Sequence, residues 1–100
     1  MKIILDKLAS EEYNDAIEYY EFELLGLGEK FKAEIKRAFQ TIIKFPHIGF
    51  IEGGDIRRYI LHKFPYKILY SIEKDYIYVI AIAHTHREPN YWINRRLPKK

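Results

Sequence analysis

Two runs rich in apolar residues, joined by a short polar turn, constrain the fold of this chain more than any other stretch. Along residues 66–72 the apolar positions alternate with others, which is the period of a β-strand. Residues 76–83 carry no charge and are apolar on both faces, as in a strand that is covered on each side. Glu73-Lys74-Asp75 separates the two runs as a turn. We therefore expect a hairpin of two strands near the middle of a sheet.

The first half of the chain predicts one short strand and two helices. Residues 2–5 are rich in β-branched residues and read as the strand. Asp6 and Ser10 can each cap the helix that follows, and the sequence does not choose between them. Gly26-Leu27-Gly28 ends that helix, because glycine readily takes the left-handed conformation. A second helix over 29–44, ended by Phe45-Pro46, completes an antiparallel helical hairpin.

The order of these elements predicts the fold class. Residues 47–55 are expected to form a loop, and residues 56–63 a further strand with basic side chains on both faces. A strand, two helices and then three strands predict one α+β domain over 1–100. In it the N-terminal strand joins a largely antiparallel β-sheet, and the helical hairpin packs on one face. The other face of the sheet is then left for a partner.

Composition and charge exclude several classes of function. The chain has no cysteine, so disulfides and thiolate chemistry are excluded. No apolar run is long enough for a signal peptide or a membrane span, so we expect a cytoplasmic protein with no membrane partner. Residues 1–55 hold 7 basic and 11 acidic residues, whereas residues 56–100 hold 10 and 3. The basic half suits phosphates or acidic protein segments. The acidic residues of the first helix are expected on a solvated face, with no catalytic role.

The residues that follow the last strand are the candidates for chemistry. Strand alternation places His84 on the face of Ile80 and Ile82. His84 and His86 lack a nearby third ligand, so we expect no metal and no cofactor. Cleavage of RNA through its own 2′-OH needs a base, an acid and cations. Residues of the right kinds are Arg57, Arg58, Lys63, His84, Arg87 and Tyr91. The same residue types also build phosphate- or carboxylate-binding surfaces, so the residues alone leave nuclease and binder open.

The end of the chain combines an aromatic residue with arginines. Trp92 can stack on a base, anchor a protein interface or pack the tail back on the sheet, and packing is the plainest of the three. Arg95 and Arg96, with the two final lysines, can be a contact surface or simply a solubilising tail.

A set of motifs in a fixed order gives the chain a family resemblance. The set consists of Ala16-Ile17-Glu18-Tyr19-Tyr20, Gly26-Leu27-Gly28 followed by Phe31, Phe45-Pro46, Arg58, Phe64-Pro65-Tyr66 with Ile68 and Tyr70, and the close formed by His84, Arg87, Pro89, Trp92 and Arg95. Each motif alone is weak, but their order and spacing are specific. Over nearly its whole length the chain resembles the RelE/ParE superfamily of toxins from type II toxin–antitoxin modules. The ParE-like branch is the most similar.

The resemblance implies a small toxin that a cognate antitoxin neutralises by wrapping a flexible segment around it. Members of the superfamily either poison DNA gyrase by binding it or cut messenger RNA on the ribosome. The closing motif with Trp92 is ParE-like, and Thr85 after His84 breaks the His-Tyr pair of one nuclease subgroup. We therefore expect a gyrase inhibitor with no cofactor, and the exposed contacts implied are Arg58, Arg87, Trp92, Arg95 and Arg96.

Two alternatives remain at this point. The first is a ribosome-dependent mRNA endonuclease, in which His84 or Tyr91 handles protons and the arginines bind phosphate. Its catalytic residues would be Arg57, Arg58, His84, Arg87 and Tyr91. The second is an inactive relative that binds only its antitoxin.

Overall fold

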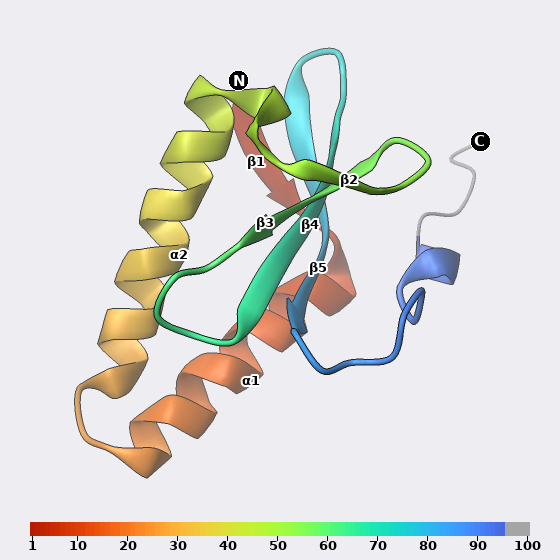
Figure 1. Ribbon diagram of the computed structural model, residues 1–100. Helices are drawn as coiled ribbons and strands as arrows, with labels where there is room; N and C mark the ends of the chain where they lie inside the picture. Colours follow the sequence, from red (N-terminus) through yellow and green to blue (C-terminus); the bar gives the residue numbers. More distant parts are fainter. Residues whose placement is uncertain (96–100) are drawn as a thin grey trace.

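The computed structural model describes residues 1–95 and contains one mixed sheet with a helical hairpin on one face (Figure 1). The elements are β1 (Lys2–Leu5), α1 (Lys7–Glu23), α2 (Leu27–Lys44), β2 (Phe50–Gly53), β3 (Ile56–Ile60), β4 (Tyr66–Ile72) and β5 (Tyr76–His84), with short 3₁₀ turns at Pro46–Ile48 and Ile93–Arg95. The five strands lie in the order β1-β5-β4-β3-β2. Only the β1–β5 pair is parallel. This arrangement confirms the predicted α+β class.

The main core lies between the helical hairpin and the sheet. From α2 the side chains of Phe31, Ile35 and Ile42 are fully buried, at the four- and seven-residue spacings of one helix face. Strands β4 and β5 contribute the facing layer, with Ile68, Tyr70, Ile77, Val79 and Ile82. Each fully buried aliphatic or aromatic side chain of this kind stabilises the fold by about 1.5–3 kcal/mol.

Local polar contacts set the ends of the helices. Asp6 is the cap of α1, since its Oδ2 accepts a hydrogen bond from the Leu8 N–H at 2.9 Å. Gly26 has φ 89°, the left-handed conformation that was expected of it. The Glu21 carboxylate holds the turn by accepting from the Gly26 N–H at 2.9 Å and the Gly28 N–H at 3.0 Å. As a result α2 begins at Leu27, two residues before the predicted start.

The segment predicted as a loop over 47–55 contains strand β2. This strand pairs antiparallel with β3 at the edge of the sheet. Its four residues show no clear alternation, because Phe50 and Ile51 are both exposed. Strand β3 ends at Ile60, before the predicted end at Lys63, because the chain turns back at 61–65 to enter β4.

A β-bulge in β5 changes which face its side chains occupy. Leu69 pairs with Ala81, but the next residue Tyr70 pairs with Val79, so β5 has one extra residue. Ile82 therefore packs in the main core with the helices, whereas Ile80 packs on the opposite face. The prediction that Ile80 and Ile82 share a face was wrong, because simple alternation cannot anticipate a bulge.

The C-terminal tail covers part of the second face of the sheet. Trp92 is 5% exposed and packs there, in a small cluster with Ile56, Leu69, Ile80 and Ala81. Figure 1 shows the tail on the side of the sheet opposite the helices. The expectation that this whole face is free for a partner was therefore wrong. Within residues 1–95, no helix is long and apolar enough to span a membrane.

Candidate functional site

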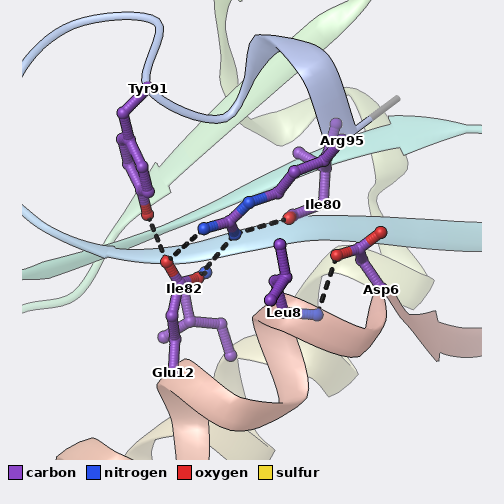
Figure 2. A network of polar contacts seen from close by, with 7 residues as sticks. All are labelled: Asp6, Leu8, Glu12, Ile80, Ile82, Tyr91 and Arg95. Atoms are coloured by element: carbon purple, nitrogen blue, oxygen red, sulfur yellow. Dashed lines mark hydrogen bonds and ion pairs between the residues drawn. The ribbon is translucent and has the colours of Figure 1, made fainter. Parts of the chain in front are cut away.

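Glu12, in the second turn of α1, is the centre of a polar network that joins the two ends of the chain (Figure 2). Its carboxylate accepts two hydrogen bonds from Arg95, from Nη1 to Oε1 at 2.9 Å and from Nη2 to Oε2 at 2.8 Å. The Tyr91 hydroxyl donates to Oε2 at 2.7 Å. The arrangement is bidentate, which is the strongest geometry for an arginine–carboxylate pair.

This network replaces a missing stretch of strand at the edge of β5. The last pair between β1 and β5 is Leu5 with Val79, so the following part of β5 has β4 on one side and no strand on the β1 side. There the Ile80 carbonyl accepts from Arg95 Nη1 at 3.2 Å, and the Ile82 N–H donates to Glu12 Oε1 at 2.9 Å. The ion pair thus supplies a donor and an acceptor to backbone groups that another strand would otherwise satisfy.

Burial and the contacts to Glu12 fix the protonation states of Tyr91 and Arg95. Burial, together with the hydrogen bond to Glu12 and its charge, raises the pKa of Tyr91 well above its ordinary value. The hydrogen bond to Glu12 raises the pKa of Arg95 further. Tyr91 therefore stays a neutral hydrogen-bond donor, and Arg95 stays a cation. A tyrosine in this state is poorly placed to act as a general base.

Glu12 is the residue that the sequence interpretation missed. Its side chain is 16% exposed, although the acidic residues of this helix were all expected on a solvated face. The spacing along the helix places Glu12 on its buried face, because Glu12 lies three residues after Ala9 and four before Ala16, and both alanines are buried. A carboxylate on the buried stripe of a helix requires a partner, and Arg95 provides it.

The residues expected to be exposed partner contacts differ in how exposed they are in the structure. The exposure that the resemblance implied for Trp92 and Arg95 is wrong, because Trp92 packs on the sheet and the Arg95 side chain is only 11% exposed in its ion pair. The plainest interpretation of Trp92, that it packs the tail back on the sheet, is confirmed. Arg87 is exposed and stacks on the Tyr91 ring, with its Cζ 3.7 Å from the ring centroid. The Arg58 side chain is 35% exposed. Arg96 lies outside the described residues.

Arg57 and Arg58 point to opposite faces of β3 and hold the β2 edge. Arg57 Nη1 donates to the carbonyls of Gly49 at 2.7 Å and His47 at 3.3 Å. Arg58 Nη1 lies 3.4 Å from Glu52 Oε1, and Lys67 Nζ lies 3.1 Å from Glu52 Oε2. Both arginines are therefore occupied by this chain's own acceptors.

His84 and Arg87 line one groove, which has a volume of about 350 Å³. The groove is lined by Glu12, Asp15, Ala16, Tyr19, Tyr66, Ile82, His84 and Arg87. The His84 ring lies 5.3 Å from that of Tyr66, and its Nδ1 accepts a hydrogen bond from the His86 N–H at 3.1 Å. The Asp15 carboxylate lines the same groove and opposes the entry of an RNA phosphate, whereas the charge of Glu12 is paired with Arg95.

The five residues proposed for RNA cleavage do not form one constellation. Arg58 pairs across the sheet with Leu69, which packs on the tail side. His84 pairs with Tyr66, which packs on the helix side. Arg58 and His84 therefore lie on opposite faces of the sheet, whereas Arg87 lines the groove of His84 and stacks on Tyr91. Among residues 1–95, no group of three histidine or acidic side chains gathers as a metal site would require.

Comparisons with known proteins bear on the family and the fold of this chain. A family model described as "ParE toxin of type II toxin-antitoxin system, parDE" matches residues 3–89. A solved structure entitled "Chromosomal ParDE TA system from P. aeruginosa" superposes with a TM-score of 0.61. The alignment covers 84% of this chain and 95% of that one at 13% identity, a level that establishes similarity of fold. No curated protein matches the sequence.

Proposed function

Because the chain belongs to the ParE family of toxins from type II toxin–antitoxin systems, we propose that it stops growth by binding DNA gyrase in the cytoplasm. A cognate antitoxin would neutralise it. On this proposal the chain inhibits by binding and catalyses no reaction. Arg58 and Arg87 are the proposed gyrase contacts, since both are at least partly exposed cations. Trp92 and Arg95 support the tail that carries Arg87.

The separation of Arg58 from His84 by the sheet is the observation that carries this choice. A nuclease needs its base, its acid and its phosphate-binding cations around one scissile bond. Here Arg58 and His84 lie on opposite faces of the sheet, and the Tyr91 hydroxyl donates to Glu12. An inhibitor that acts by binding needs none of this convergence, so the distribution of residues supports the gyrase proposal.

Purified protein and purified gyrase provide the direct test. We expect the chain to block supercoiling or to trap cleaved DNA, while ribosome-bound messenger RNA stays intact. Arg87→Ala should weaken this inhibition at least tenfold, as expected when a charged contact is lost at an interface. Lys74→Ala, at an exposed position of the β4–β5 turn, is the matched control and should inhibit as the wild type does. Unchanged gyrase activity at saturating wild-type protein would reject the proposal.

One observation favours the nuclease alternative, namely that His84 and Arg87 line the same groove. If that alternative holds, the chain added to ribosomes programmed with a message cuts it at codon-phased positions. His84→Ala and Arg87→Ala would then both abolish cutting while leaving the folded state intact. Normal supercoiling together with such cuts would replace the gyrase proposal with this one.

A further inference from the structure

A hollow lined almost entirely by aromatic rings lies beside the groove of His84 and Arg87. Its volume is about 510 Å³, and its lining residues are Tyr19, Tyr20, Pro65, Tyr66 and His84. We call it the tyrosine groove. Tyr19, Tyr66 and His84 also line the groove described above, so the two hollows are continuous. From Tyr19 through Tyr20 and Tyr66 to His84 the rings meet edge to face, with interplanar angles of 72°, 69° and 75°.

The tyrosine groove has a fixed floor and an exposed side. Tyr20 and Tyr66 are half-buried and pack edge-on or tilted against Phe31 of the main core, so their rings form the floor. Tyr19 is 57% exposed and stands at the side of the hollow. A floor that is held in place by the core costs little ordering when a ligand binds.

The polar atoms of the tyrosine groove are hydrogen-bond donors. In the part of the chain that the structure describes, the tyrosine hydroxyls that bond to other groups are those of Tyr70, Tyr78 and Tyr91, so those of the groove have no acceptor. Burial raises the pKa of Tyr66, and raises that of Tyr20 to about 12, so both hydroxyls keep their proton. His84 Nδ1 accepts from the His86 N–H, so Nε2 is the protonated nitrogen of the neutral ring.

Aromatic faces combined with free donors select one kind of peptide. A helix cannot use these donors, because its carbonyls already bond within the helix. A β-strand brings an N–H group with every carbonyl, and the groove offers those N–H groups few acceptors. A proline-rich segment in the polyproline II conformation has unbonded carbonyls and no N–H at its prolines. Its rings also pack well in grooves lined by aromatic side chains.

One carboxylate sets the charge that such a segment should carry. Asp15 lies one helical turn before Tyr19 and lines the adjoining groove. Among residues 1–95, no cation lies within ion-pair distance of it. An arginine or lysine beside the prolines would pair with Asp15.

We propose that the tyrosine groove binds a proline-rich segment of a partner protein, with a basic residue at one end. The proline rings lie against Tyr19 and Tyr66, the segment's carbonyls accept from the tyrosine hydroxyls, and the basic side chain pairs with Asp15. This inference goes beyond the proposed function, and it holds whether the toxin acts on gyrase or on messenger RNA.

A synthetic peptide with a run of prolines and a C-terminal arginine is the probe, titrated by fluorescence anisotropy. We expect it to bind at least about tenfold more tightly than a peptide with glycine in place of each proline, because glycine lacks both the ring and the preformed conformation. Tyr19→Ala should weaken binding by about tenfold or more, as for an aromatic anchor at an interface. Phe22→Ala is the matched control, since Phe22 lies on the same helix, is 90% exposed and lines neither hollow. It should bind as the wild type does.

Two conservative variants separate the contributions of the hydroxyl and the charge. Tyr19→Phe keeps the ring and should weaken binding by roughly threefold to tenfold, the range for one hydrogen bond. Asp15→Asn should reduce the affinity to that of an all-proline peptide, and the difference should shrink as salt is added. Equal affinities for the proline and glycine peptides would overturn the inference, as would equal losses in Tyr19→Ala and Phe22→Ala. Unchanged far-ultraviolet circular dichroism and Trp92 emission show that each variant is folded. Inhibition of gyrase is measured without the peptide, so the two proposals fail independently.

Discussion

Removing the Glu12 carboxylate should destabilise the protein by about 3 kcal/mol, and two routes lead to this figure. In Glu12→Ala, an Arg95 that stays in place is a buried cation without a partner, beside the unpaired N–H of Ile82 and hydroxyl of Tyr91. Breaking a buried pair in this way costs about 3–5 kcal/mol. If instead the tail leaves the sheet so that Arg95 reaches water, the buried contacts of Trp92 are lost, at a similar cost of about 3–5 kcal/mol. The variant takes whichever of the two changes costs less free energy, and the lower cost is the loss of stability that is measured.

Denaturation followed by two probes measures both the size of the loss and its route. Trp92 is the only tryptophan of the chain, so its fluorescence reports the tail specifically. Far-ultraviolet circular dichroism reports the helical hairpin. If the tail leaves first, the Trp92 emission of Glu12→Ala should shift to the red at urea concentrations where the helices are still intact. If it stays, both probes change together at a lower midpoint.

A double-mutant cycle isolates the ion pair from the other contacts of Glu12. Arg95→Met keeps an apolar stem and removes the charge. The double variant Glu12→Ala with Arg95→Met should be more stable than the sum of the single effects predicts, by at least about 1 kcal/mol. A loss below about 1 kcal/mol in Glu12→Ala, with unchanged Trp92 emission, would refute the claim that the pair holds the tail.

Three further predictions concern the β2 edge and the tyrosines. Tyr70→Phe should cost about 1–3 kcal/mol in urea unfolding, because the buried hydroxyl donates to the Pro46 carbonyl at 2.7 Å and accepts from the Gly49 N–H at 3.0 Å; an unchanged midpoint would refute this role. Gly49→Ala should cost about 1–3 kcal/mol, since its Cβ would lie 2.6 Å from the Arg58 carbonyl oxygen. In the control Gly53→Ala the new Cβ meets nothing within 4 Å, so this variant should be tolerated. Equal melting temperatures of the two variants would contradict the close packing around Gly49. Burial raises the pKa of Tyr20 to about 12, so between pH 10 and 12 the unfolded state loses a proton that the folded state keeps, and stability should fall as pH rises through that window. The difference in tyrosinate absorbance between the wild type and Tyr20→Phe isolates Tyr20; it should develop only together with unfolding, and a difference that develops near pH 10 in the folded protein would contradict the prediction.

The order of elements in this fold could be predicted because each has a local signal. The alternation along 66–72 and the apolar run 76–83 predicted β4 and β5, and Gly26 was expected to take the left-handed conformation that it has. Strand β2 was missed because its stability comes from pairing with β3 and from the Arg58 contact to Glu52, and neither is visible in its own four residues. Tertiary pairing decided the outcome where local preference was weak.

The candidate site was harder to predict, because its contacts join residues far apart in the chain. Glu12 and Arg95 are 83 positions apart, and no local pattern links them. The bulge at Ile80 then reverses the face that alternation assigns to that residue. Residue types were informative about chemistry, since His84 and Arg87 do share a groove. The resemblance implied surface contacts at Trp92 and Arg95, although packing on the sheet was the plainer interpretation of Trp92.

Because β1 pairs with β5, the sheet cannot be completed until β5 has been synthesised. Asp6 and Tyr78 bond to each other across 72 positions, so β1 leaves the ribosome long before its neighbour exists. At about 5–20 residues per second, translation separates them by roughly 4–14 s. The Arg95 contact comes later still. During this interval the apolar faces of α1 and α2 lack the sheet that covers them in the finished protein. The sheet therefore stays incomplete until β5 has been made, and the contacts of the tail through Arg95 can form only after that.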